Sequence, residues 1–282
     1  MPSIGKIKRL NRLFNSSGTV VIVPMDHGIT VGPIKGLDDM HSTIGRLING
    51  GADAILLNKG MIPHNFDSLK EKEVGVIMHL SGSTDMGIHS LYKVPTGTIY
   101  EALAMGCDAV SVHINLGSDK EPDMLRDLAA ISSECYQYGL PLLAMIYTRG
   151  GKIRNDYDPG LIKHAARLGA EIGADIVKVN YTGDRNSFED VVRSCPVPVI
   201  IAGGEKINDD DKLLRMVFEA IQAGAKGVSI GRNIFQHNNI EALLKAISLI
   251  VHQNTSFETA RDAYRESTRP HPLPRKTFIS AN

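Results

Sequence analysis

The stretch GADIVKVNYTGD, residues 173–184, contains the local signals that decide the fold. Gly173 stands where a helix would end in the left-handed conformation, and Ala174 and Asp175 lead at once into the apolar run IVKV. That run is short and rich in β-branched residues, which is typical of a buried parallel strand, and Gly183 closes the turn after it. The segment therefore predicts one unit of helix end, tight loop, strand and turn.

The same unit recurs along the chain. Seven further apolar runs end in glycine or polar residues: TVVIVPMDHG (19–28), AILLNKG (54–60), VGVIMHLSGS (74–83), AVSVHINLG (109–117), LPLLAMIYTRG (140–150), VPVIIAGG (197–204) and GVSIGRN (227–233). Helical periodicity is clearest between them in six segments: 37–50, 98–106, 122–139, 159–173, 209–224 and 240–252. Gly-Ala-Asp-like steps also stand at 51–53, 106–108 and 224–226.

This alternation predicts an α/β protein, a (β/α)8 TIM barrel. A doubly wound open sheet has the same local signals, but no G-x-G-x-x-G follows the first strand, as the common dinucleotide-binding version requires. The 282 residues fit one barrel of about 250 residues with short additions. We therefore expect residues 1–282 to form a single barrel domain with a short N-terminal extension. We expect a C-terminal tail to leave the barrel after about Asn254, packing on a neighbour or remaining mobile.

Composition restricts the kinds of partner. Lys plus Arg equals Asp plus Glu at 31 each, which gives no electrostatic reason to expect nucleic acid or an anionic membrane. No apolar run approaches the roughly 20 residues of a membrane helix, and the basic N-terminus lacks the features of a signal peptide. Cys107, Cys135 and Cys195 have no paired spacing, so we expect reduced thiols, a cytoplasmic protein, and neither metal nor cofactor.

Lys178 is the residue with the strongest chemical signal. Its neighbours Val177 and Val179 are apolar, and strand residues alternate between faces, so the valines are expected to face the helices and Lys178 the barrel interior. Burial disfavours the ammonium form, and a neutral lysine is a nucleophile toward carbonyls. The pattern predicts a Schiff-base lysine. A structural lysine paired with an interior carboxylate stays open as the alternative.

Two further side chains close strands at the same end of the barrel, where barrel enzymes carry their active sites. Counting by twos places Asp26 on the inner face of the first strand and Tyr147 on that of the fifth. A carboxylate and a phenol can supply the proton transfers that Schiff-base chemistry needs. His27 is the second choice for a base, since it should point away from the interior, and His113 is expected to be a hydrogen-bonded core histidine.

The seventh and eighth strands predict a phosphate site. They end in Gly203-Gly204 and in Gly231-Arg232, and barrels often hold a phosphate between the loops after these two strands. Glycines let backbone N–H groups approach an oxyanion, and Arg232 adds a charged fork. Tight turns after strands are the alternative reason for these glycines.

The chain resembles the archaeal-type class I aldolases of the DeoC/LacD family. The matching stretches are IVPMDHGITVGPIKGL, IMHLSGST, DAVSVHINLGSD, HAARLGAEIGADIVK, YTGD and GVSIGRNIFQH, and they cover nearly the whole chain. The family's Schiff-base lysine matches Lys178, and its catalytic aspartate and tyrosine match Asp26 and Tyr147. Its phosphate-binding residues match Gly203, Gly204, Gly231 and Arg232.

The resemblance implies a transaldolase-like reaction. A ketose phosphate, 6-deoxy-5-ketofructose 1-phosphate, is cleaved on the lysine, and the fragment retained as an imine is joined to L-aspartate semialdehyde. The product enters a route to aromatic compounds, and family members typically assemble as pentamers or decamers. Relatives implied by the same resemblance use dihydroxyacetone phosphate with aspartate semialdehyde or cleave fructose 1,6-bisphosphate.

Three positions depart from the family pattern. Thr148 and Glu205 stand where proline is frequent, and Asn58 stands where histidine is frequent, before Lys59 and Gly60. We expect these positions on the substrate face, where they bear on the choice of acceptor aldehyde. Two functions outside Schiff-base catalysis stay open, namely a non-catalytic sugar-phosphate-binding barrel and a metal-dependent aldolase, although no histidine pair has a clustered ligand spacing.

Overall fold

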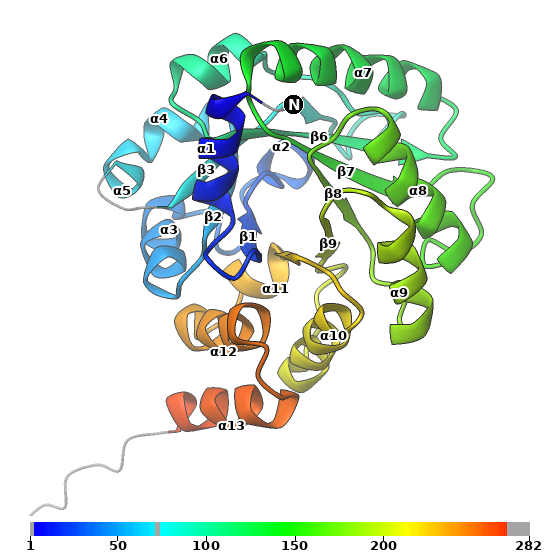
Figure 1. Ribbon diagram of the computed structural model, residues 1–282. Coiled ribbons are helices and arrows are strands. Elements are labelled where there is room, and N and C mark those ends of the chain that lie inside the picture. Colours follow the sequence, from blue (N-terminus) through cyan, green and yellow to red (C-terminus); the bar gives the residue numbers. More distant parts are fainter. Residues whose placement is uncertain (1–2, 71–73, 270–282) are drawn as a thin grey trace, which may run out of the picture.

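The computed structural model describes residues 3–70 and 74–269, and it is a closed eight-stranded parallel barrel surrounded by helices (Figure 1). The strands follow one another around the barrel in the order β1-β10-β9-β8-β7-β6-β3-β2. The barrel strands are β1 Val20–Pro24, β2 Ala54–Asn58, β3 Gly75–His79, β6 Ala109–Leu116, β7 Leu142–Thr148, β8 Ile176–Val179, β9 Val199–Ala202 and β10 Gly227–Ser229. Each predicted apolar run contains one of them, so the predicted barrel is confirmed.

A small antiparallel hairpin departs from this regular order. Strands β4 Ser81–Gly82 and β5 Val94–Pro95 pair with each other in the segment between β3 and β6. Every neighbouring pair in the barrel itself is parallel. The hairpin is therefore an addition at the carboxyl end of β3, where it borders the mouth of the barrel.

The six predicted helices are present with ends shifted by a few residues. They are α3 Met40–Asn49, α6 Ile99–Ala104, α7 Glu121–Tyr138, α8 Pro159–Glu171, α10 Asp210–Gln222 and α12 Ile240–Gln253. The sequence did not indicate the others: α1 Ile4–Leu13, α2 Gly28–Val31, α4 Met61–His64, α5 Phe66–Leu69, α9 Arg185–Ser194, α11 Arg232–Phe235 and α13 Phe257–Thr268. Four of these are single turns, which are too short to show a period.

The Gly-Ala-Asp steps connect helices to strands in the predicted way. Gly51, Gly106, Gly173 and Gly224 have φ angles of 91°, 71°, 100° and 96°, which is the left-handed region that favours glycine. The aspartates of three steps also have a role that the pattern did not predict. Asp53, Asp108 and Asp175 each accept the backbone N–H of a residue at the start of the neighbouring strand, at 2.6, 3.0 and 2.9 Å. These carboxylates join adjacent strands at the amino-terminal end of the barrel.

Alternation along the strands divides the apolar side chains into two cores. The outer core lies between strands and helices and includes Val177 and Val179. The inner core fills the barrel and contains Ile22, Leu56, Ile77, Leu143, Ile176 and Ile200. Helix α1 closes this inner core, because Leu13 belongs to it and is fully buried (Figure 1).

One buried ion pair and one at the surface hold α1 in place. Lys6 Nζ lies 2.9 Å from Asp175 Oδ2, and Arg12 Nη1 lies 2.9 Å from Asp108 Oδ1. The partners are two of the aspartates that join adjacent strands. The N-terminal extension is therefore part of the barrel's base.

The expectation for the C-terminal tail is wrong over 257–268. Helix α13 packs against α10 and α12 of the same chain, as Figure 1 shows at the red end of the colour scale. Phe257 and Ala260 supply its buried face, and they are too few to have indicated a helix in the sequence. Pro270, Pro272 and Pro274 lie outside the described residues. No helix within the described ranges is long and apolar enough to cross a membrane.

We predict that Leu13→Ala lowers the free energy of unfolding by about 2–5 kcal/mol, the usual cost of truncating a buried leucine. The side chain is fully buried at the base of the inner core, so its loss leaves a cavity there. Urea denaturation measures the change, and Lys8→Ala on the exposed side of α1 is the matched control. Equal stability of the two variants would show that α1 does not close the barrel.

Candidate active site

A cavity of about 290 Å³ opens at the carboxyl ends of the barrel strands. Residues from six of the eight strands and the loops that follow them, and from the β4–β5 hairpin, line it. All seven site residues expected from the sequence are on its wall: Asp26, Tyr147, Lys178, Gly203, Gly204, Gly231 and Arg232. Residues as far apart in the chain as Asp26 and Arg232 thus meet in one chamber.

Lys178 lies in the interior of the barrel. Its neighbours Val177 and Val179 pack in the outer core, as the alternation predicts, and Lys178 itself is 5% exposed. β8 pairs with β7 so that Lys178 lies beside Met145, and the Nζ–Sδ distance is 3.5 Å. A thioether is a weak acceptor, so this contact leaves the amine available to react.

Asp26 is a carboxylate under all ordinary conditions. Burial alone would raise its pKa, but His79, His27 and Lys178 outweigh burial and lower the pKa to about 2. His27 Nδ1 lies 3.4 Å from one carboxylate oxygen, and His79 Nε2 lies 3.6 Å from the other. Asn58 Nδ2 donates to the backbone carbonyl oxygen of Asp26 at 2.9 Å and so helps to hold this residue in place.

His79 is a neighbour of the site that the sequence analysis did not single out. It is the last residue of β3, and its Nδ1 lies 2.7 Å from the Ser111 hydroxyl. Burial lowers the pKa of His79 to about 4, so the ring is neutral at pH 7. Nε2 faces Asp26, which can only accept, so the N–H of the neutral ring belongs on Nε2 and the Ser111 hydroxyl donates to Nδ1. The alternation along β3 could have placed His79 on the inner face, because it lies two residues after Ile77 of the inner core.

The expected orientation of His27 is wrong. We expected it to point away from the interior because it follows Asp26, but it lines the same cavity. Strand β1 ends at Pro24, and residues 26–27 form a turn that leads into α2, so the two-residue alternation no longer applies. The ring packs edge-on against Phe235 with 5.3 Å between centroids.

Tyr147 is held between two side chains. The His113 ring lies edge-on at 4.8 Å, and the Arg149 guanidinium lies 4.7 Å from the ring centroid on the tyrosine. His113 Nε2 also lies 3.0 Å from Asn115 Oδ1, and burial holds the pKa of His113 well below its usual range. His113 is thus both a hydrogen-bonded core histidine, as expected, and a wall of the cavity.

The glycines after β9 and β10 are required by close packing. A Cβ on Gly203 would lie 2.6 Å from Ile230 Cγ2, and a Cβ on Gly231 would lie 2.8 Å from the Pro24 carbonyl oxygen. Among the described residues, Arg232 Nε and Ser229 Oγ are buried without a hydrogen-bond partner. Buried polar atoms without partners are rare in proteins, and these two border the cavity beside the glycines.

The three departures from the family pattern do not line this cavity. Asn58 contacts the backbone of Asp26, Thr148 donates to the Asp156 carbonyl at 3.0 Å, and Glu205 lies outside this cavity. The expectation that these positions face the substrate is therefore wrong for this chamber.

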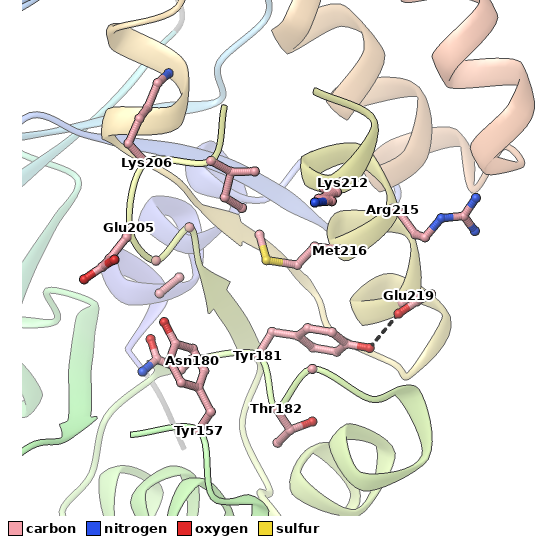
Figure 2. Close-up of a pocket in the computed structure, with 15 residues that line it drawn as sticks. Tyr157, Asn180, Tyr181, Thr182, Glu205, Lys206, Lys212, Arg215, Met216 and Glu219 are labelled. Atoms are coloured by element: carbon pink, nitrogen blue, oxygen red, sulfur yellow. Dashed lines mark hydrogen bonds between the residues drawn. The ribbon is translucent and has the colours of Figure 1, made fainter. Parts of the chain in front are cut away.

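Glu205 borders a second, neighbouring cavity of about 570 Å³. Figure 2 shows this cavity, in which the Tyr181 hydroxyl donates to Glu219 at 3.1 Å. Both cavities share Asn180, Ala202, Gly203 and Gly204 as a common wall. Within 3–70 and 74–269, no three His, Cys, Asp or Glu side chains are grouped to hold a metal ion.

Relatives of known name are similar to this chain over most of its length. A Halobacterium salinarum 2-amino-3,7-dideoxy-D-threo-hept-6-ulosonate synthase is 42% identical over 92% of this chain and 96% of its own. A Streptomyces griseus 2-amino-4,5-dihydroxy-6-oxo-7-(phosphonooxy)heptanoate synthase is 37% identical over 90% of this chain and 92% of its own.

A solved structure shares the fold. It is an archaeal fructose-1,6-bisphosphate aldolase with its catalytic lysine covalently bound to the carbinolamine intermediate of the substrate. It is 30% identical, covers 88% of this chain and 99% of its own, and has a TM-score of 0.80. The model of the DeoC/LacD family aldolases matches residues 20–237. The resemblance inferred from the sequence is thereby confirmed, and the chain belongs to the DeoC/LacD family of aldolases.

Proposed function

We propose that this protein is a Schiff-base aldolase or transaldolase that joins a fragment of a ketose phosphate to L-aspartate semialdehyde. The observation that carries the proposal is Lys178, an inward-facing lysine on a cavity wall that also carries Asp26 and Tyr147. The donor that we favour is 6-deoxy-5-ketofructose 1-phosphate, since the Halobacterium relative is named for a 2-amino-3,7-dideoxy product.

The names of the two relatives' products support the choice of acceptor. Both are seven-carbon chains with a carboxylate at one end and an amino group on carbon 2, and they differ at carbon 7, which is deoxy in one and phosphorylated in the other. A four-carbon amino-acid aldehyde accounts for the common end. Dihydroxyacetone phosphate is the alternative donor, because it would leave a phosphate on carbon 7.

The chemistry begins with the amine of Lys178. The free amine adds to the donor's ketone carbon, and loss of water gives a protonated imine. The carbon–carbon bond beyond the adjacent carbon then breaks, its electrons pass into an enamine, and the departing carbon becomes an aldehyde as its hydroxyl loses a proton. The enamine carbon attacks the acceptor aldehyde, the new alkoxide takes up a proton, and water releases the product from the lysine.

Asp26 and Tyr147 divide the proton transfers of these steps. Asp26 is ionised, so it accepts a proton and stabilises the iminium charge on Lys178. Tyr147 moves the proton of the substrate hydroxyl, since a phenol can both donate and accept. The neutral imidazole of His79 keeps Asp26 oriented without cancelling its charge.

The phosphate of the substrate binds between the loops after β9 and β10. Arg232 Nε and Ser229 Oγ have no partner among the described residues, and a phosphate oxygen would satisfy them. Gly203, Gly204 and Gly231 line the cavity at this wall, where their backbone N–H groups can approach the phosphate. Arg232 supplies the charge.

We also propose that the protein works in the cytoplasm as a homo-oligomer, a pentamer or decamer, and that it needs no cofactor. Cys107, Cys135 and Cys195 are all buried and free, which suits a reducing compartment. Exposed apolar side chains such as Tyr136 and Ile4 offer surface for contacts between copies.

We predict that borohydride with the ketose phosphate fixes one adduct, on Lys178. Mass spectrometry of the digested protein locates it. Lys178→Arg should lose essentially all turnover, because a guanidinium that stays protonated cannot form the imine. Lys59→Arg, an exposed lysine at the same end of the barrel, should keep it. An adduct on Lys93 or Lys206, or none, would contradict the assignment of Lys178.

We predict that Arg232→Ala raises KM for phosphorylated substrates far more than for their dephospho analogues. The loss should be on the order of 1.5–3 kcal/mol, which is typical of a hydrogen bond to a charged group. Steady-state kinetics on matched substrate pairs measure it, with Arg154→Ala, an exposed arginine of the loop after β7, as the control. An equal loss for both substrates of a pair would assign Arg232 a structural role.

We predict that Tyr147→Phe and Asp26→Asn lower kcat by about 10²–10⁴-fold, the usual contribution of acid–base catalysis. Borohydride trapping separates their roles. Tyr147→Phe should keep some adduct, and Asp26→Asn should keep less, because the carboxylate also acts on Lys178. Tyr157→Phe, at the rim of the second cavity, is the control. Near wild-type turnover in both variants would transfer the acid–base role to His27 or His113.

A further inference from the structure

Lys93 is a buried cation that the reaction as described above does not use. It directly precedes β5 on the hairpin between β3 and β6, it is 9% exposed, and it lines the cavity. Its ammonium donates to the Ser83 hydroxyl at 2.5 Å, while that hydroxyl donates to the Ser90 carbonyl at 2.6 Å. No carboxylate of the described residues lies within 4.0 Å of it, so two of its three N–H groups have no partner among them.

Burying the ammonium group of Lys93 without an anionic partner costs free energy. Burial of a charge is offset only by pairing and hydrogen bonding, and a single hydroxyl offers one bond. Burial lowers the pKa of Lys93, and the carboxylates of Asp85 and Asp26 act against that change. The open side of the ammonium is the cavity, so an anionic group of a ligand is the partner that the site lacks.

Arg149 adds a second cation on the same wall. It follows β7, its Nε lies 3.2 Å from Asp156, and its guanidinium covers the Tyr147 ring. Asp156 accepts only from Nε of the Arg149 guanidinium, so the other N–H groups of the guanidinium can bind a ligand. Asp85, on the turn of the hairpin, lines the cavity beside them and makes no ion pair with a described residue.

The order of the strands places this group across the barrel from the phosphate site. The proposed phosphate site lies between β9 and β10, and the hairpin lies between β3 and β6. Four strands separate the two gaps in either direction around the barrel. The cavity therefore has two cationic ends, with Lys178 and Asp26 on the wall between them.

We propose that Lys93 and Arg149 bind the carboxylate of the acceptor aldehyde and that Asp85 binds its ammonium group. The acceptor is then an α-amino acid whose aldehyde end points toward the enamine on Lys178. This inference rests on the proposed function and names the residues that would choose the acceptor. A phosphorylated aldehyde fits less well, because its double negative charge would face Asp85, and Arg149 is already shared with Asp156.

Binding of unreactive analogues tests the assignment without requiring turnover. L-Homoserine has an alcohol in place of the aldehyde of aspartate semialdehyde, 4-hydroxybutyrate lacks the amino group, and 3-amino-1-propanol lacks the carboxylate. Titration calorimetry on Lys93→Met should show homoserine bound on the order of 10- to 100-fold more weakly than by the wild type. Lys152→Met removes an exposed charge on the loop after β7, which also carries Arg149, and should bind homoserine as the wild type does.

Asp85→Asn provides a second test on an exposed residue, where folding is not at risk. It should weaken homoserine several-fold and leave 4-hydroxybutyrate unchanged. Trapping of dihydroxyacetone phosphate on Lys178 should be the same in Lys93→Met as in the wild type, which shows that the donor site is intact.

The outcomes separate this inference from the proposed function. Homoserine binding that depends on Lys93, in a protein that does not use aspartate semialdehyde, would support the inference and overturn the function. Unchanged homoserine binding in Lys93→Met, or none in the wild type, would overturn the inference. Glycerol 3-phosphate binding more tightly than homoserine and depending on Lys93 would also overturn it, because the anion would then be a phosphate.

Discussion

The closure of eight strands into a barrel is the constraint on which the rest of the structure depends. Closure makes every strand alternate strictly between an outer core under the helices and an inner core, so a polar residue on the inner face has no route to solvent except the mouth. Lys178 lies on that face between two outward valines, and the inner core below it is apolar down to Leu13 of α1. The lysine is therefore held on the wall of the cavity at the carboxyl ends of the strands.

The charge of the cavity differs from the charge of the chain as a whole. The chain as a whole is neutral, yet the cavity wall carries Lys93, Arg149, Lys178 and Arg232 against Asp26 and Asp85. The buried histidines of the site do not add to the positive charge, because burial lowers the pKa of His27, His79 and His113. A net positive chamber attracts anionic ligands, and the ionised Asp26 lies within it as the proposed partner of the iminium on Lys178.

Much of this arrangement could be predicted from the sequence because it follows from local patterns. Eight apolar runs identified eight strands, and parity along β8 placed Lys178 in the interior. The sequence did not predict the orientation of side chains outside the barrel strands, where the alternation between faces no longer applies. His27 lies in a turn after Pro24, and Lys93 reaches the cavity from a hairpin whose two strands have two residues each. Helix α13 was missed for a different reason, since only Phe257 and Ala260 of its twelve residues are buried. Contacts made by loop residues cannot be predicted in this way, because loops have no periodic pattern of apolar residues.

The strands and the hairpin hold their cavity residues in different ways. Lys178, Met145 and Tyr147 are fixed by parallel pairing, and moving any of them would change the register of the barrel. Lys93, Ser83 and Asp85 lie on an antiparallel addition that shares no pairing with the barrel strands in the described residues. Substitutions on that hairpin can therefore alter the proposed acceptor site while the residues on the barrel strands stay in place. On the proposed assignment, the residues that make the bond and those that choose the acceptor depend on different backbone hydrogen bonds, those of the barrel and those of the hairpin.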